Sequence, residues 1–207
     1  RRMGIDLNLE DTEDESYTYL HFHSLHTGHS MHFPAILTDF SDSYQSNWNE
    51  EEVYGRMDPV AIFKNTRRSL SLGFKIVSAD QLDNRDQHGV LNNLIQCLYP
   101  SYTSVGGVKL LKGAPLWRIK FGNLITNSFN GVGSAQKTGL PGYITNFSTT
   151  PELEDGYFAT NKTLTPKSWS ISFDFQVLHD QTPGWIEEST QGAKSVITDV
   201  FGIKNNN

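Results

Sequence analysis

The sequence predicts a mainly β fold: an antiparallel β-sandwich or barrel with one flanking α-helix. Two segments, Ser69–Ile76 and Ser168–Val177, alternate between polar and apolar residues, the pattern of a strand with one wet and one buried face. A third segment, Asp80–Pro100, carries apolar residues at helical spacing. Aromatic residues make up 12% of the 207 residues, and their large side chains can fill a core although only 37% of the chain is apolar.

Five further segments alternate less regularly and are weaker strand candidates. Together with the two clear strands they give seven, a number typical of a sandwich or a barrel. The five segments are Tyr17–Leu25, Phe33–Phe40, Val60–Lys64, Leu116–Phe121 and Tyr143–Phe147.

The helix is expected at about residues 81–98. Asp80 is a suitable N-cap, because its carboxylate can accept from the free amides of the first turn. The apolar residues Leu91, Leu94, Ile95 and Leu98 then follow the i, i+3, i+4, i+7 pattern, and Pro100 ends the helix.

Three segments show neither pattern and are expected to be irregular. Residues 42–58 are predicted to form a long loop and residues 128–142 a glycine-rich loop. In the chain after residue 179, the apolar residues of Val196–Phe201 indicate a short amphipathic helix. We therefore divide the chain into an acidic N-terminal arm (1–16), a β domain (17–179) and a C-terminal extension (180–207).

Charge and hydropathy exclude several classes of protein. The net charge of −6 and the isoelectric point near 5.6 argue against a basic surface that grips duplex DNA. The sequence contains no run of about 18 apolar residues, so no membrane span is predicted. Residues 1–16 carry six acidic side chains against two arginines and lack the apolar region of a signal peptide.

No pattern in the sequence predicts catalysis or a cofactor. The usual nucleophile, phosphate-binding and metalloprotease motifs are absent from the sequence, so we expect a protein that is not an enzyme. Five of the seven histidines lie between residues 21 and 32. The alternative interpretation is a metal ion held by His21 and His23, which share a face of a strand; we favour solvated or interface histidines, and Cys97 as a core residue.

An ordered set of short motifs resembles the baseplate-proximal tail-tube proteins of tailed bacteriophages, which initiate the tube at its junction with the baseplate hub. The resemblance covers roughly Phe33 to Trp185. The motifs are Phe33–Phe40, Ser46–Trp48, Val53–Pro59, Asn65–Leu72, Leu98–Tyr102, Pro115–Phe121, Gly142–Phe158 and Pro166–His179.

This resemblance implies a fold of the tail-tube type and a ring, expected to be a hexamer, at the junction of tail tube and baseplate. Such a ring would build the channel for DNA ejection and template tube assembly. Its partners would be further copies of itself and the adjacent tail-tube and baseplate or hub proteins, while DNA passes without specific binding. The chain would reside in the virion tail after assembly in the host cytoplasm.

If the chain forms a ring, two groups of residues have expected roles. The wet strand faces are candidates for the lumen, and the 42–58 segment is the candidate contact with the next subunit, ring or baseplate neighbour, with Trp48 as its anchor. The lumen candidates are Ser69, Ser71, Ser170, Ser172, Asp174 and Gln176. The contact candidates are Trp48, Glu50, Glu51, Glu52, Tyr54 and Arg56.

The competing interpretation is a β-sandwich binding module on a virion or cell surface. Such a module would recognise a glycan or a peptide through Trp48, Trp185 and neighbouring tyrosines. The state of assembly distinguishes the two, since a binding module works as a monomer or small oligomer and a tube component forms rings.

Overall fold

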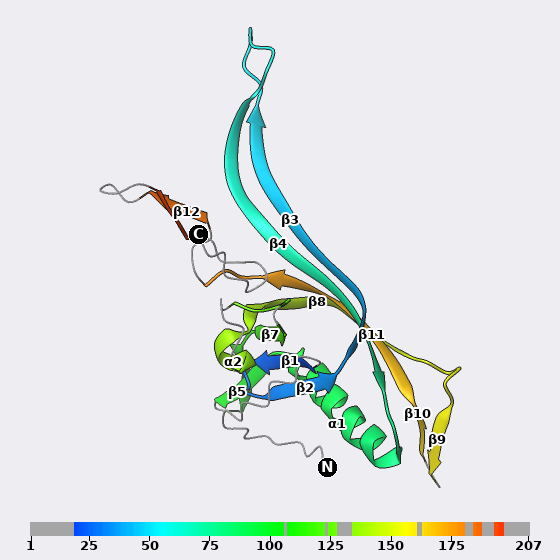
Figure 1. Ribbon diagram of the computed structural model, residues 1–207. Helices are drawn as coiled ribbons and strands as arrows, with labels where there is room; N and C mark the ends of the chain where they lie inside the picture. The colour runs from blue at the N-terminus through cyan, green and yellow to red at the C-terminus, as the bar shows by residue number, and fades with distance from the viewer. Residues whose placement is uncertain are drawn as a thin grey trace.

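A seven-stranded antiparallel sheet forms the body of the protein (Figure 1). The computed structural model describes residues 19–105, 107–122, 124–127, 134–160, 163–180, 184–187 and 193–196. The strands follow the order β2-β1-β7-β8-β11-β4-β3 across the sheet. Their bounds are β1 (Tyr19–Ser24), β2 (Ser30–Pro34), β3 (Ile36–Glu51), β4 (Val60–Val77), β7 (Trp117–Phe121), β8 (Leu140–Pro151) and β11 (Ser168–Val177).

The other described elements are three hairpins and two helices. The mainly β fold with one flanking helix is thus confirmed, since the second helix has only four residues. No helix in the described ranges has the length and apolarity that a membrane crossing requires. The hairpins are β5 (Ser101–Val105) with β6 (Val108–Gly113), β9 (Tyr157–Thr160) with β10 (Thr163–Pro166), and β12 (Gly184–Glu187) with β13 (Ala193–Val196); the helices are α1 (Gln81–Cys97) and α2 (Ala135–Thr138).

The sheet is rolled so strongly that strands far apart in its order face each other. β2 and β3 are at opposite ends of the strand order, yet only Ala35 separates them in the chain. The ring of Phe22 on β1 lies 6.4 Å from the ring of Phe74 on β4, although β7, β8 and β11 lie between these strands in the sheet. In a flat sheet four strand spacings would separate them by about 19 Å. The rolled sheet therefore packs against itself, as in a partly closed barrel.

Aromatic rings fill the interior of this roll. Phe22 contacts Trp117 of β7 and Phe173 of β11, with ring centroids 6.3 and 5.6 Å apart. Phe33 of β2 lies 6.0 Å from Phe74. These five side chains are almost completely buried, so few residues supply a large buried area.

Helix α1 closes the roll and begins where the sequence predicts. The Asp80 carboxylate accepts the amide N–H of Asp83 at 2.8 Å, and Leu91 and Leu94 are buried in the aromatic core. Its first turns also bury polar groups: Asn84 donates to the carbonyl of Pro166 at 2.7 Å and to the Ser78 hydroxyl at 3.1 Å. These hydrogen bonds fix the helix to the strands that precede and follow it.

The predicted loop over residues 42–58 is wrong. Residues 42–51 belong to β3, which continues to Glu51, and the predicted strands Val60–Lys64 and Ser69–Ile76 are parts of one strand, β4. The distal halves of β3 and β4 are exposed on both faces, so burial imposes no apolar alternation there. Sequence periodicity reports one-sided burial and therefore missed them.

Other boundaries differ for local reasons. The predicted strand Phe33–Phe40 divides at Pro34, where the chain passes from β2 to β3, since proline lacks the amide that a continued ladder needs. Part of the expected 128–142 loop forms α2 and the start of β8. Val196, expected in a helix, lies in β13. Residues 1–16 and 197–207, with the rest of that helix, are outside the described residues.

The core and the distal part of β4 offer a matched test. We expect Phe74→Ala to lower the free energy of unfolding by about 3–5 kcal/mol, because it opens a cavity among packed rings. Phe63→Ala, on the same strand but 52% exposed, is expected to change it by less than about 1 kcal/mol. Urea unfolding of dilute protein measures both, and equal losses would contradict the position of the core.

Candidate functional site

Polar residues cover the face of the sheet opposite the aromatic core. Asp174 of β11 lies opposite Ser71 of β4, and Gln176 opposite Ser69; Ser170 and Ser172 continue along β11. Directly paired residues on neighbouring strands share a face. The six residues proposed from the sequence to line a lumen are thus on one surface, which we call the polar face.

The polar face extends over two more strands than the sequence predicted. On β3, Ser41 lies opposite Ser71 and Ser43 opposite Ser69. On β8, Ser148 lies opposite Ser172 and Thr150 opposite Ser170. The alternation of polar residues in these strands is too irregular to identify them from sequence. Four adjacent strands therefore present mostly small hydroxyl side chains.

Charged groups on the polar face are few and mostly bound to neighbours. Asp174 accepts from the Asn146 side-chain amide at 2.8 Å, and Asn146 occupies the left-handed region with φ 51°, in a bulge of β8. Lys75 pairs with Asp155 at 2.8 Å. That contact raises the pKa of Lys75 and lowers the pKa of Asp155, chiefly through their hydrogen bond.

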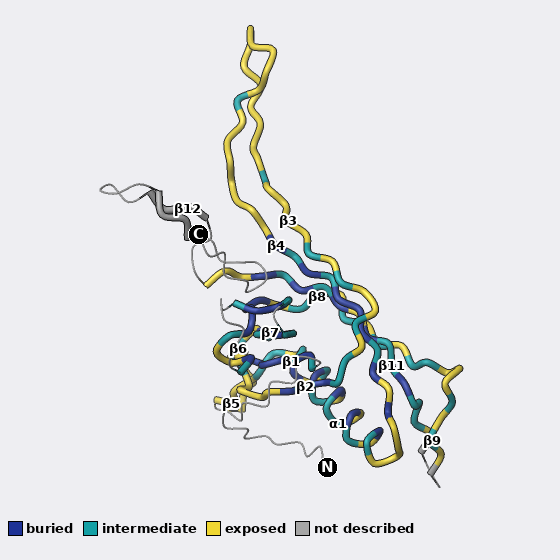
Figure 2. Tube along the Cα trace, viewed as in Figure 1, coloured by how far each residue is buried: buried dark blue, intermediate teal, exposed yellow. Residues whose placement is uncertain are grey.

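The six candidate contact residues all lie on the distal half of the β3–β4 hairpin, defined as residues 44–67. Trp48, Glu50 and Glu51 are in β3, while Glu52, Tyr54 and Arg56 are in the turn between the strands. The hairpin extends well beyond the body (Figure 1) and is exposed along almost its whole distal half (Figure 2).

An aromatic pair that the sequence analysis missed lies on this hairpin. The rings of Trp48 and Phe63 meet edge to face with centroids 5.2 Å apart, and their side chains are 54% and 52% exposed. Ile62 is 52% exposed on the opposite face. Large apolar groups on both sides of a projecting ribbon mark a surface that a partner can cover.

A buried ion pair holds the base of this hairpin. Arg68 of β4 donates two hydrogen bonds to the Asp42 carboxylate at 3.1 and 2.8 Å, and both side chains are less than 10% exposed. The guanidinium lies over the Tyr44 ring, 5.4 Å from its centroid. Burial, with Asp42 nearby, raises the pKa of Tyr44 to about 12. Beyond this cluster the hairpin loses its contact with the core.

The long hairpin also has unpaired edges. β3 pairs only with β4 among the described strands, so its other edge is free over sixteen residues. β11 pairs with β4 only from Ser69 onward, which leaves the N-terminal half of β4 free on that side. Free edges are templates for pairing with another chain.

The histidines lie at the other end of the sheet. His21 of β1 faces His32 of β2 across the strands, and Lys120 and Arg118 of β7 lie opposite His21 and His23. Burial, then the charges of His32 and Lys120, lowers the pKa of His21 to about 4. Burial also lowers the pKa of His23 and of His32.

This arrangement gives the alternative metal interpretation little support. Arg118 and Lys120 place positive charge beside His21 and His23, and a cation would be repelled. Within the described ranges, no group of three or more His, Cys, Asp or Glu side chains is placed to hold a metal ion. The imidazole of His23 instead hydrogen bonds with the Ser30 hydroxyl at 2.8 Å.

Comparisons with known proteins add little to these surfaces. No protein-family model matches the chain, and no curated protein matches it. Among solved structures it is similar to a chain described as "Tail of empty GTA particle computed with helical refinement, C6 symmetry". The two are 9% identical and superpose with a TM-score of 0.31, over 79% of this chain and 94% of the other. A likeness at this level carries no argument for function.

The histidines predict a pH-dependent stability. In the folded state the pKa of His21 is about 4, against 6.5 for the free group, so the unfolded chain binds more protons between these values. The contribution of His21 to the free energy of unfolding is therefore fully present above about pH 6.5, and it is lost as the pH decreases toward 4. We expect His21→Gln to reduce this slope, measured by urea unfolding at pH 7 and pH 5. The matched control His88→Gln, at an exposed position on α1, should keep the wild-type slope; an unchanged slope in His21→Gln would contradict the assignment.

The base of the hairpin gives a second prediction. Arg68→Met leaves the Asp42 carboxylate buried without its partner, and we expect a loss of about 3–5 kcal/mol in the free energy of unfolding. Lys75→Met breaks the more exposed pair with Asp155 and should cost much less, because water screens the two charges. Thermal and urea unfolding compare the two. Similar costs would show that burial does not govern the Arg68–Asp42 pair.

Proposed function

We propose that this chain is a non-enzymatic structural subunit of a bacteriophage tail that forms a ring at the junction of tail tube and baseplate. The observation that carries the proposal is the free edge of β3, which borders directly on the polar face. The ordered motifs of the sequence, which resemble tail-tube proteins, support the same role. The sheet of a single copy is unfinished, and a second copy can continue it.

Ring formation follows from adding copies at this edge. If a strand of the next copy pairs with β3, the polar face continues from one subunit into the next. Each addition applies the same rotation, and a rotation that closes gives a ring without exposed edges. A hexamer is what the sequence resemblance implies.

The polar face suits a lumen through which DNA moves. Its serine and threonine hydroxyls offer no fixed positive charge to phosphates and no surface on which bases can stack. Tyr143 of β8, opposite Gln176 and 41% exposed, is an aromatic side chain on this face. Its one ammonium over the body of the sheet, that of Lys75, is paired with Asp155. DNA would therefore pass such a surface without being held.

The distal hairpin suits a contact with the next subunit, because it carries the outer half of the free β3 edge, and also a contact beyond the ring. It carries Trp48 and Phe63 as exposed aromatic anchors, and acidic residues surround its turn. Aromatic groups of this kind often dominate the energy of an interface. Contact of the hairpin with a tube subunit or a baseplate neighbour would let one ring template the next, in a virion tail assembled in the host cytoplasm.

Shortening the hairpin tests this proposal. Ser46 lies opposite Thr66, so replacing residues 47–65 by Asn-Gly makes a tight two-residue turn without touching the core. We expect the full chain to form rings in negative-stain images. The shortened chain should stay folded and soluble but sediment as a monomer.

Three measurements keep this test decisive. Far-ultraviolet circular dichroism and the melting temperature verify that the shortened chain keeps its core. Rings from the shortened chain equal to those of the full chain would remove the hairpin from assembly. A full chain that remains monomeric at every concentration would overturn the ring itself.

A further inference from the structure

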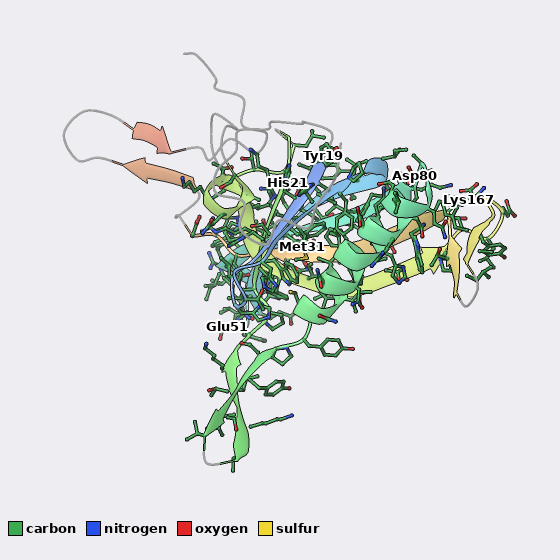
Figure 3. All side chains as sticks on the ribbon, turned by 90° about the horizontal axis from the view of Figure 1, so that it is seen from below. Tyr19, His21, Met31, Glu51, Asp80 and Lys167 are labelled. Carbon is green, nitrogen blue, oxygen red and sulfur yellow. The ribbon has the colours of Figure 1, made fainter. Side chains whose placement is uncertain are left out.

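The β5–β6 hairpin is a second projection whose apolar side chains are uncovered. It leaves the body beyond the C-terminal end of α1 (Figure 3), and no third strand pairs with it in the described part of the chain. A two-stranded hairpin is only marginally stable in water on its own. Its apolar side chains are all at least half exposed: Tyr102 59%, Val105 61%, Val108 60%, Leu110 50% and Leu111 66%.

One face of this hairpin has a defined pattern of apolar and charged groups. Tyr102 lies opposite Leu111, and Ser104 lies opposite Lys109, so these four side chains share a face. The apolar pair is nearer the body and the polar pair nearer the tip. Between residues 99 and 113 the sequence contains two lysines and no acidic residue.

The distal half of the β3–β4 hairpin carries the matching pattern with the opposite charge. Trp48 lies opposite Phe63, and two residues farther on Glu50 lies opposite Ala61. Residues 49–59 contain four carboxylates and one arginine. The charge is therefore displaced from the apolar pair toward the tip on both hairpins.

The two patterns also agree in spacing. Leu111 and Lys109 are two residues apart on β6, as are Trp48 and Glu50 on β3. Two residues of a strand span about 7 Å. A single face-to-face arrangement can therefore place Leu111 on Trp48 and the Lys109 ammonium beside the Glu50 carboxylate.

We propose that the β5–β6 hairpin of one copy packs on the Trp48–Glu50 face of the distal hairpin of a second copy. The two surfaces lie on different parts of the chain, and the hairpins leave the body in different directions (Figures 1 and 3). The contact is therefore head to tail and can pass from copy to copy. This inference rests on the proposed function and names the surface that receives the long hairpin.

A charge exchange between two variants tests the contact. In Lys109→Glu alone and in Glu50→Lys alone, each contact would bring like charges together. We expect the concentration for half-assembly, measured by sedimentation velocity, to rise about tenfold or more in each variant. In an equal mixture the copies can alternate, so that every contact again joins opposite charges. The mixture should assemble near the wild-type concentration.

Matched controls use the same changes of charge elsewhere. Glu154→Lys alters an exposed residue in the turn between β8 and β9, and Arg85→Glu alters an exposed residue of α1. Both should assemble as the wild type does. Unchanged melting temperatures verify that all variants fold.

The outcomes separate this inference from the proposed ring. Assembly of Lys109→Glu and Glu50→Lys at the wild-type concentration, or no recovery on mixing, would overturn the contact but leave the ring standing. Recovery on mixing with open chains in place of rings in negative stain would support the contact and overturn the ring. A wild-type chain that never assembles would overturn both.

Discussion

The meeting of Phe22 and Phe74 inside the rolled sheet is the contact on which the rest of the structure depends. It joins strands that are far apart in the sheet order, and it requires tight curvature on the way. Gly142 shows how tight: a Cβ atom there would collide with the Gln176 carbonyl and the Phe175 ring. Because the roll buries one face of every strand in the body, the opposite face remains for polar residues.

The long hairpin is a consequence of where the roll ends. β3 and β4 are longer than the core they cover, and the last side chains that the body buries along them are those of the Arg68–Asp42 pair. Farther out, the strands have only each other. A ribbon of two strands cannot bury large apolar groups by itself. The contacts within a single copy therefore do not explain why Trp48 and Phe63 are large and apolar.

Sequence periodicity predicted the elements that have one buried face and missed the strands that have none. The strict alternation in Ser168–Val177 and the helical spacing from Leu91 to Leu98 come from contact with the core, and both elements formed as expected. The distal half of β3 has no buried face and was taken for a loop. β5 and β6 could have been found, because two glycines between β-branched and apolar residues are a strong hairpin signal.

The candidate surfaces also contain some positions that local alternation predicts and others that it does not. The polar face was predicted from the wet positions of β4 and β11, which alternate with core residues; its extension to Ser148 on β8 needed the strand order, which no local pattern contains. The pairing of Trp48 with Phe63 needed the register of β3 on β4. Positions that depend on contacts between distant segments were therefore outside the reach of periodicity.

The free edge of β3 supports the proposal that this chain works as an assembly of copies. Monomeric proteins protect an edge strand with lysine, proline or covering segments. Between Ile36 and Glu51 the sequence contains neither lysine nor proline, and no described strand covers this edge. Its carboxylates, among them Asp39 and Glu51, discourage pairing of the edge with itself but permit pairing with a complementary surface. Two β3 edges repel each other, whereas a β3 edge can still pair with a different, complementary surface. Such an edge favours ordered head-to-tail assembly over aggregation.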